Sequence, residues 1–150
     1  MPQFRKLNAS HLKECFQIWQ DLKDHYDYPV GGEWSQSKMV EELNSHQGLG
    51  AFSDKGSLEA FCLFRKSGEI LEIMLLATKW CEHRVGTMRG LILSLIRNLA
   101  SNEKIWLEVH GGNSPAIGLY ESLGFILTGE RLNYYSDGGK ALLFEYKLLQ

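Results

Sequence analysis

The segment from residue 105 to residue 125 constrains the fold more than any other part of this chain. From 105 to 110, apolar residues alternate with more polar ones at a period of two, which predicts a β-strand. The glycine pair at 111–112 ends that strand. Ser114 and Pro115 come next and are typical of a helix N-cap and a first helical position, because proline lacks an N–H group that would have no partner there. The segment is therefore expected to fold as a strand, a sharp turn and a helix.

The predicted helix carries a tyrosine on its apolar face, and the strand before it carries a carboxylate. The apolar face is formed by residues at three- and four-residue spacing: Ala116, Leu119, Tyr120 and Leu123. Gly124 follows and is typical of a helix C-terminus. Glu108 lies close to the end of the strand. We therefore expect Glu108 to lie beside a cleft into which Tyr120 can point.

This segment and the residues after it resemble the C-terminal half of the GNAT acyltransferase superfamily, and within it the ribosomal-protein alanine N-acetyltransferases. The resemblance is carried by residues in one order and spacing: Trp106, Leu107, Glu108, Val109, Asn113, Ala116, Ile117, Leu119, Tyr120, Glu121, Leu123, Gly124, Phe125, Arg131, Tyr134 and Tyr135. One residue of this set would be a weak signal, whereas the whole set is specific. The resemblance implies one N-acetyltransferase domain over residues 1–150, with acetyl-CoA as co-substrate.

The rest of the chain predicts a mixed α/β fold with the element order β-α-α-β-β-β-α-β-α-β-β, which is also the order that the resemblance implies. Helices are expected after the N-caps Ser10 and Ser35, over 87–100, and after Ser114. Strands are expected at 4–7, 48–53, 58–65, 69–78, 105–110, 125–132 and 140–148. The run at 69–78 is mostly apolar, which is typical of a central strand buried on both faces.

Composition and charge narrow the range of partners. The chain has 150 residues, of which 44% are hydrophobic, and a net charge of −2. Its basic residues are scattered, so we expect no nucleic-acid partner. No apolar run approaches the length of a membrane span, so no membrane association is expected. The three cysteines have no CxxC spacing, which favours free thiols in a reducing, cytoplasmic compartment. The five histidines have no metal-ligand spacing, so no metal is expected.

The resemblance implies where acetyl-CoA binds. In the GNAT superfamily it lies between two splayed strands, and its pyrophosphate rests on a loop of pattern Q/R-x-x-G-x-G/A that opens a helix, where backbone N–H groups suit a phosphate. The corresponding loop here is 83–88, and only Gly86 agrees with the pattern. An alternative register, with Arg84 at the basic position, would put Thr87 and Arg89 at the glycine sites. The residues expected to contact acetyl-CoA are Leu76, Ala77, Thr78, Arg84, Val85, Gly86, Thr87, Met88, Arg89 and Asn113.

Catalytic roles follow from the same resemblance. Glu108 would act as the general base, through a water molecule, and Tyr120 as the acid that protonates the coenzyme A thiolate. A main-chain N–H group around 76–78, where the family's strand carries a bulge, would stabilise the oxyanion. The residues alone leave open a solvated or ion-paired Glu108 and a core Tyr120. His110 is either another base or a polar strand end, and Cys81 is not expected to be a nucleophile.

The acceptor is expected to be a primary amine, and the N-terminal amine of a protein or peptide fits best. At pH 7.5 roughly a third of α-amines are neutral, against about one lysine in a thousand, so a modest carboxylate base suits an α-amine. Trp34, Tyr134 and Tyr135 match aromatic residues that the resemblance places around the acceptor, although they could equally be loop aromatics. Two alternatives stay open: a transferase acting on a small-molecule amine, and a non-catalytic domain that binds coenzyme A or a partner protein. The irregular loop at 83–88 motivates the second alternative.

Overall fold

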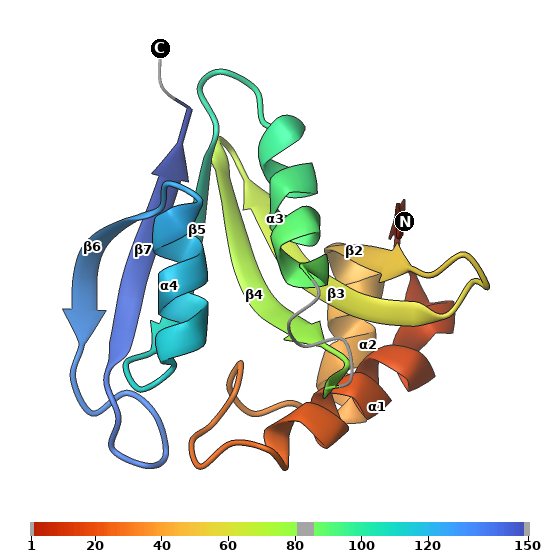
Figure 1. Ribbon diagram of the computed structural model, residues 1–150, viewed down its shortest axis with the longest axis horizontal. Coiled ribbons are helices and arrows are strands. Elements are labelled where there is room, and N and C mark those ends of the chain that lie inside the picture. Colours follow the sequence, from red (N-terminus) through yellow and green to blue (C-terminus); the bar gives the residue numbers. More distant parts are fainter. Residues whose placement is uncertain (1, 81–85, 149–150) are drawn as a thin grey trace.

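A seven-stranded sheet runs through the centre of the molecule (Figure 1). The computed structural model describes residues 2–80 and 86–148. The elements, in chain order, are β1 (Gln3–Lys6), the 3-10 helix η1 (Ala9–His11), α1 (Leu12–Lys23), α2 (Gln36–Ser45), β2 (Gln47–Phe52), β3 (Leu58–Ser67), β4 (Ile70–Thr78), α3 (Thr87–Arg97), β5 (Lys104–His110), α4 (Ser114–Ser122), β6 (Ile126–Arg131) and β7 (Ala141–Lys147). The mixed α/β fold predicted from the sequence is confirmed, with element ends that differ by a few residues.

The strands lie in the order β1-β2-β3-β4-β5-β7-β6, so β7 is inserted between β5 and β6 although it follows both in the chain. Neighbouring strands are antiparallel, except for the parallel pair β4 and β5. That pair holds together only at its start, where Ile70, Leu71 and Glu72 face residues of β5. Beyond Glu72 the two strands diverge and leave a gap in the middle of the sheet (Figure 1). The candidate active site is built around this gap.

Two hydrophobic cores cover the two faces of the sheet. The first core joins α1 and α2 to one face and includes Trp19 and Met39. The second core joins α3 and α4 to the other face and includes Leu91, Ile105 and Leu107. Because side chains alternate across a strand, the polar residues between the buried positions of β5 face the α1 and α2 side. Glu108 is one of them.

A bulge in β4 exchanges the faces of this strand. Leu71 and Ile73 belong to the second core, whereas Leu75 and Ala77 belong to the first. A period of two would keep all four residues on one face, so one extra residue must lie between Ile73 and Leu75. The pairing with β3 shows the shift at this point, which leaves Met74 as the extra residue. The bulge expected around 76–78 therefore lies earlier in the strand, and the apolar run hides it because both faces are buried.

Helix starts agree in part with the predicted caps. Ser35 caps α2 as expected, and its Oγ accepts a hydrogen bond from the N–H of Lys38 at 3.1 Å. Ser10 is not a cap, because it lies inside η1, whose N-cap is Asn8. Ser114 is the first residue of α4, and the N-cap is Asn113. In both corrected cases an asparagine, an equally good cap, precedes the serine that was predicted.

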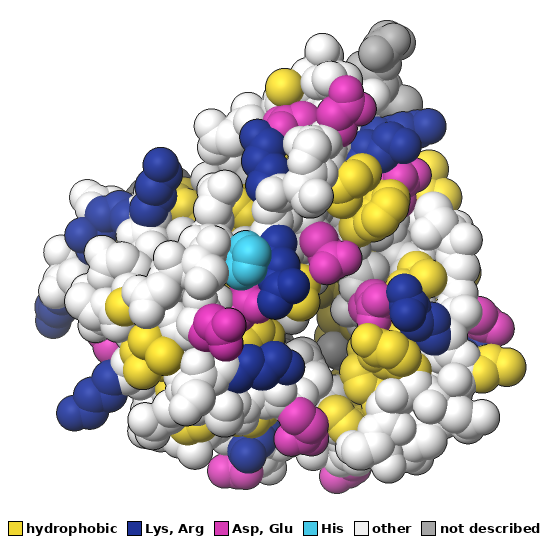
Figure 2. Space-filling model, turned by 180° about the vertical axis from the view of Figure 1, so that it is seen from behind, with side chains coloured by type: hydrophobic (Ala, Val, Ile, Leu, Met, Phe, Trp, Pro, Cys, Tyr) yellow, Lys and Arg dark blue, Asp and Glu magenta, His cyan; other side chains and the backbone are white. Residues whose placement is uncertain are grey.

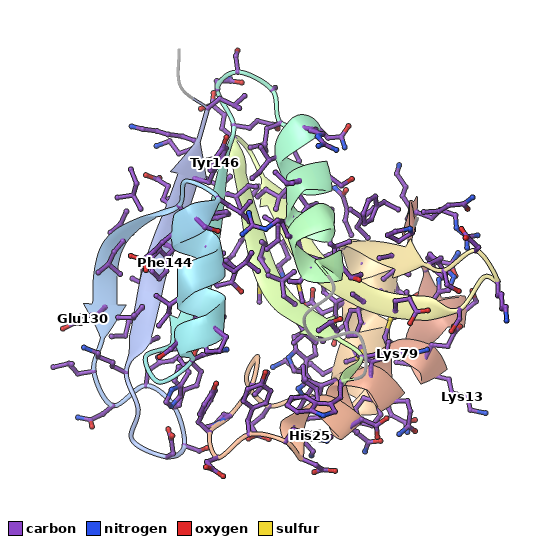
Figure 3. All side chains as sticks on the ribbon, in the orientation of Figure 1. Lys13, His25, Lys79, Glu130, Phe144 and Tyr146 are labelled. Carbon is purple, nitrogen blue, oxygen red and sulfur yellow. The ribbon has the colours of Figure 1, made fainter. Side chains whose placement is uncertain are left out.

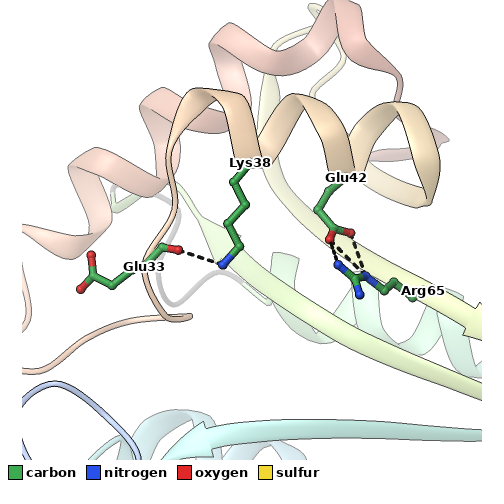
Figure 4. A network of polar contacts seen from close by, with 4 residues as sticks. All are labelled: Glu33, Lys38, Glu42 and Arg65. Atoms are coloured by element: carbon green, nitrogen blue, oxygen red, sulfur yellow. Dashed lines mark hydrogen bonds and ion pairs between the residues drawn. The ribbon is translucent and has the colours of Figure 1, made fainter.

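A charged contact ties α2 to the sheet (Figure 4). Glu42 on α2 is buried, and the guanidinium of Arg65 on β3 donates hydrogen bonds to both oxygens of its carboxylate. The hydrogen bond with Glu42 raises the pKa of Arg65. At the start of α2, Lys38 donates a hydrogen bond to the carbonyl of Glu33 at 3.1 Å. These contacts fix α2 and the loop before it against the face of the sheet that Glu108 occupies.

Candidate active site

Three cavities lie in a row through the gap between β4 and β5. The front cavity, about 280 Å³, lies between β4 and the starts of α3 and α4, and its lining includes Gly86 and Tyr120. The rear cavity, about 450 Å³, opens on the α1 and α2 side, and its lining includes Glu108. The middle cavity, about 60 Å³, shares Tyr120 with the front cavity and Glu108 with the rear cavity. Figure 2 shows the rear face of the molecule, which is hollowed between hydrophobic and acidic side chains.

Tyr120 forms one wall of the middle cavity. The side chain comes from α4, is buried, and packs against Phe125 and Phe144 with ring centroids 5.7 and 6.1 Å away. Burial raises the pKa of its hydroxyl above the ordinary value for tyrosine. The phenol is therefore protonated throughout the physiological range and can donate a proton into the cavity. The ring is both a core residue and a cavity residue, so its place in the core is compatible with the predicted role as an acid.

Glu108 forms the opposite wall. It lies on β5, where strand alternation turns it away from the second core, and its side chain is 32% exposed. The Nε atom of Arg131 on β6 lies 3.5 Å from its Oε1 atom. Glu108 also contributes to raising the pKa of both Tyr134 and Tyr135, after the larger effect of burial. A carboxyl group that lines the middle cavity is placed as a general base requires.

The start of α3 faces the front cavity. Gly86 is the N-cap, with φ of 81°, a left-handed conformation that glycine adopts without strain. Helix N-termini present free N–H groups and the positive end of the helix dipole, so this end of α3 suits an anion. Met88 and Arg89 line the same cavity, and Arg89 donates a hydrogen bond to Ser122 on α4 at 2.8 Å. Thr87 is buried at the first helical position.

Residues 81–85 contain part of the predicted phosphate loop. The expected contacts Arg84 and Val85, together with His83 and Cys81, lie outside the described residues. Neither register considered for 83–88 is therefore tested.

The last residues of β4 present main-chain groups to the gap. The N–H of Lys79 bonds to Glu59 on β3 at 2.9 Å. Because N–H groups alternate in direction along a strand, that of Ala77 also points to β3, and those of Leu76 and Thr78 point toward the gap. Leu76 and Thr78 line the front cavity, whereas the side chain of Ala77 is buried in the first core.

Asn113 has two places in the structure. Its Oδ1 accepts a hydrogen bond from the N–H of Ala116 at 3.3 Å, which caps α4. The residue also lines both the front and the middle cavities. Its role as a cap is thus compatible with the predicted contact between Asn113 and acetyl-CoA.

The predicted acceptor residues gather around the rear cavity. Trp34, Tyr134 and Tyr135 all line it, although they come from the α1–α2 loop and the β6–β7 loop. Trp34 is buried, donates a hydrogen bond to the carbonyl of Gly31 at 2.8 Å, and carries the Nζ atom of Lys38 over its ring at 4.7 Å. Tyr134 is about half exposed. Aromatic walls of this kind suit the apolar stems and backbone of a peptide.

Several residues of the site were not predicted to be site residues. Glu72 and Trp106 line the rear cavity from the last paired positions of β4 and β5. Val30 lines the front and middle cavities, where the α1–α2 loop crosses the open end of β4. The Pro-Val-Gly-Gly turn in this loop was a visible signal for a chain reversal, but nothing local shows which strand it crosses. Arg131 belongs to the quoted motif, and only its contact with Glu108 reveals its place in the site.

Two further kinds of feature bear on function. Across residues 2–80 and 86–148, no group of three or more histidine, cysteine, aspartate or glutamate side chains is arranged to hold a metal ion. No helix in the same part of the chain is long and apolar enough to cross a membrane.

Comparison with known proteins confirms the family. The FR47-like protein family matches residues 48–135. The ribosomal protein bS18-alanine N-acetyltransferase of Escherichia coli strain K12 is 30% identical over 109 residues, which are 70% of this chain and 74% of that enzyme. A crystal structure of the ribosomal-protein alanine N-acetyltransferase from Escherichia coli covers 100% of this chain and 97% of its own, at 25% identity and a TM-score of 0.85. Ard1 from Thermoplasma volcanium is also 25% identical, with 99% of both chains covered and a TM-score of 0.80. This chain belongs to the FR47-like family of GNAT N-acetyltransferases.

Proposed function

We propose that this chain transfers the acetyl group of acetyl-CoA to the α-amine at the N-terminus of a protein or peptide. The observation that carries this proposal is the middle cavity, where a carboxylate and a protonated phenol face one small space. A larger cavity adjoins it on each side of the sheet, so two substrates can approach the same point from opposite faces. A cytoplasmic location belongs to the same proposal.

The front cavity is assigned to acetyl-CoA. The N-terminal amides of α3, beginning at Gly86, would hold the pyrophosphate, and Arg89 places positive charge beside it. Pantetheine would then run along the open edge of β4 toward the middle cavity. There the N–H groups of Leu76 and Thr78 face the gap and, within the described part of the chain, have no neighbouring strand to bind. They are therefore the candidates to bind the thioester carbonyl.

The proposed chemistry uses one residue on each side of the carbonyl. Glu108 takes a proton from the acceptor ammonium, through a water molecule, and leaves the amine neutral. The amine nitrogen attacks the thioester carbon, and a main-chain N–H stabilises the oxyanion. When the carbon–sulfur bond breaks, Tyr120 gives its proton to the departing thiolate. The proton that the attacking nitrogen loses as the amide forms passes through water and restores the phenol, and Glu108 releases its proton to the solvent. An amide and free coenzyme A are the products.

The rear cavity is assigned to the acceptor. Its volume of about 450 Å³ accommodates the first residues of a peptide, and Trp34, Tyr134 and Tyr135 supply its aromatic walls. The relative from Escherichia coli acts on an alanine of ribosomal protein bS18, which supports an α-amine as the acceptor here.

A panel of acceptors tests the proposal. Hexapeptides with a free N-terminal alanine should be acetylated by acetyl-CoA, whereas the same peptides with a blocked α-amine and an internal lysine should not. Transfer to polyamines or other small amines, with none to the free peptides, would instead favour a small-molecule transferase. Calorimetry with acetyl-CoA addresses the non-catalytic alternative, for which binding without transfer to any amine of the panel is the expected result.

A further inference from the structure

His110 makes hydrogen bonds and ring contacts beside the site, and the proposed chemistry does not use it. The residue ends β5, two positions beyond Glu108 and on the same face of the strand. Its Nδ1 atom accepts a hydrogen bond from the N–H of Gly112 at 2.9 Å. The other ring nitrogen, Nε2, therefore carries the hydrogen in the neutral ring and donates it to Asp137, whose Oδ2 lies 2.8 Å away. Both ring nitrogens are thus occupied.

This arrangement decides between the two interpretations of His110. A general base needs a free lone pair within reach of the acceptor amine. The lone pair of Nδ1 is used by Gly112, and Nε2 has none in this tautomer. His110 therefore does not serve as a second base.

The imidazole ring also joins two loops. It stacks on Tyr28 of the α1–α2 loop, with ring centroids 4.7 Å apart and planes inclined by 21°. On the β6–β7 loop it contacts Tyr135, with centroids 4.9 Å apart. The loops belong to distant parts of the chain, and both border the rear half of the gap. One side chain at the end of β5 connects them.

The partner of His110 shapes the loop that carries the acceptor tyrosines. Asp137 accepts a hydrogen bond from the N–H of Gly139 at 2.9 Å. The carbonyl of Gly139 in turn accepts hydrogen bonds from the N–H groups of Tyr134 and Tyr135, at 3.1 Å each. A Cβ atom at Gly139 would lie 2.2 Å from the Nε2 atom of His110, so a side chain at that position is incompatible with the contact. The turn and the histidine are fitted to each other.

The same loop forms part of the proposed active site. Tyr135 lines the middle and rear cavities, and Tyr134 lines the rear cavity. We propose that His110 is a positioning residue, which through Asp137 holds the β6–β7 loop in the shape that binds the N-terminal residues of the acceptor. The inference rests on the proposed function, and it adds a residue that acts on acceptor binding rather than on the transfer step.

Two substitutions of His110 separate its two hydrogen bonds. In His110→Gln the side-chain amide nitrogen occupies the place of Nε2 and can still donate to Asp137. In His110→Asn the side-chain oxygen occupies the place of Nδ1 and keeps only the bond to Gly112. Both variants lose the stacked ring, so the comparison between them sets the bond to Asp137 against the bond to Gly112. His11→Asn is the matched control, because its Nδ1 also accepts a backbone N–H, at 3.0 Å, and the residue lines none of the three cavities.

Steady-state kinetics with the N-terminal alanine hexapeptide give the main measurement. His110→Asn loses a hydrogen bond to a charged group, which should weaken peptide binding. KM for the peptide should therefore be about tenfold higher in His110→Asn than in His110→Gln. KM for acetyl-CoA should stay at the wild-type value in both variants. Asp137→Ala should raise KM for the peptide as His110→Asn does, and the double variant should be no worse than either single one. Equal peptide KM values in the Asn and Gln variants, or additive effects in the double variant, would overturn the inference.

Hydrogen exchange supplies a measurement that does not depend on activity. The amides of Tyr134 and Tyr135 should exchange faster in His110→Asn than in His110→Gln, while the amides of α3 stay unchanged. Unchanged exchange in the loop would show that His110 does not hold it and would contradict the inference. If the wild type transfers no acetyl group to any peptide, the proposed function itself fails, and the role in acceptor binding fails with it. The two failures are therefore distinguishable.

Discussion

Glu108 is well placed to receive a proton because the strand and its neighbours define where its carboxylate points. The side chain leaves the second core, meets Arg131 at 3.5 Å and borders the middle cavity. Glu108→Gln keeps the shape and removes the basic oxygen. We expect kcat for the hexapeptide to fall about a hundredfold or more, within the range known for general bases, with the Kd of acetyl-CoA unchanged. Initial-rate assays with the hexapeptide measure kcat, and calorimetry measures the Kd of acetyl-CoA.

A matched variant shows whether the loss belongs to the site. Glu130→Gln also removes a strand carboxylate from an ion pair, with Lys140 at 3.3 Å, but Glu130 points away from the cavities at the outer strand β6 (Figure 3). It should retain wild-type turnover. If Glu108→Gln retained it as well, Glu108 would not be the base.

Tyr120 carries the complementary prediction. Tyr120→Phe keeps the ring in its buried place and removes only the hydroxyl, so the fold and acetyl-CoA binding should survive. Turnover should fall by about a hundredfold if the hydroxyl protonates the leaving thiolate. The effect should shrink with an acyl donor whose thiol is more acidic, because a better leaving group needs less help. Tyr146→Phe on β7, in the same core but outside the three cavities, serves as the control (Figure 3).

At the level of single residues, the resemblance pointed to side chains of one local motif. It did not point to contacts that depend on distant parts of the chain. Glu108, Tyr120 and Asn113 sit in a contiguous motif and do meet at the middle cavity. The contact of His110 with Asp137 spans 27 positions. It exists because β7 pairs with β5, which brings the β6–β7 loop to the end of β5. No local pattern encodes that pairing.

The elements themselves were predictable where one face of each is polar. Helices α1 and α3 follow from their amphipathic spacing, and the end of β5 follows from its alternation and the glycines after it. The bulge in β4 was not predictable in position, because a strand buried on both faces shows no alternation to interrupt. The starts of η1 and α4 were each missed because serine and asparagine are comparable caps and both were present.

The attachment of α2 to the sheet gives a prediction at the level of an element. Arg65→Leu leaves the carboxylate of Glu42 buried and without its partner. Because an uncompensated buried charge is costly, we expect the free energy of unfolding to fall by about 2–4 kcal/mol, measured by urea denaturation. The exposed pair of Glu130 and Lys140 offers the comparison, since Glu130→Gln should cost less than about 1 kcal/mol. Equal losses in the two variants would mean that Glu42 finds water or another donor.

The whole molecule is one sheet that opens in its middle, with a core on each face. One core holds α1 and α2 against β3 and the end of β4, and the other holds α3 against β2, β3 and β4 and holds α4 beside β7. The strands part between these cores after only three paired positions. In the proposed function, this opening gives each substrate its own face of the sheet and a common point of contact. Element order alone does not predict this opening, because the opening depends on where the pairing of β4 with β5 ends.

Burial of weak acids in the two cores and in the loops beside them leads to a prediction for the whole molecule. Burial raises the pKa of Cys15 to about 12, raises that of Tyr28 to about 12, and raises those of Cys62, Tyr120 and Tyr135 further above their ordinary values. In the unfolded chain these thiols and phenols ionise near pH 8.5 and 10 respectively. The folded chain therefore holds more protons than the unfolded chain above about pH 8.5, and its stability must fall as the pH rises.

The measurement is the urea midpoint between pH 7 and pH 10.5, which should stay level at first and then decline. Cys15→Ala removes one of the titrating thiols, so the decline between about pH 8.5 and 10 should be shallower in this variant, by at most about 1.4 kcal/mol per pH unit. A loss of stability below pH 7 would have another cause, the protonation of carboxylates. Hydrogen bonding lowers the pKa of two of them, Asp137 and Glu145. Lowered carboxyl pKa values stabilise the folded chain above about pH 4, and this stabilisation is lost as the pH falls. The losses of stability at acidic and at alkaline pH therefore have separate causes, and separate variants can remove them. A midpoint that stayed constant up to pH 10.5 would mean that the buried thiols and phenols ionise as easily in the folded chain as in the unfolded one, and it would contradict the prediction.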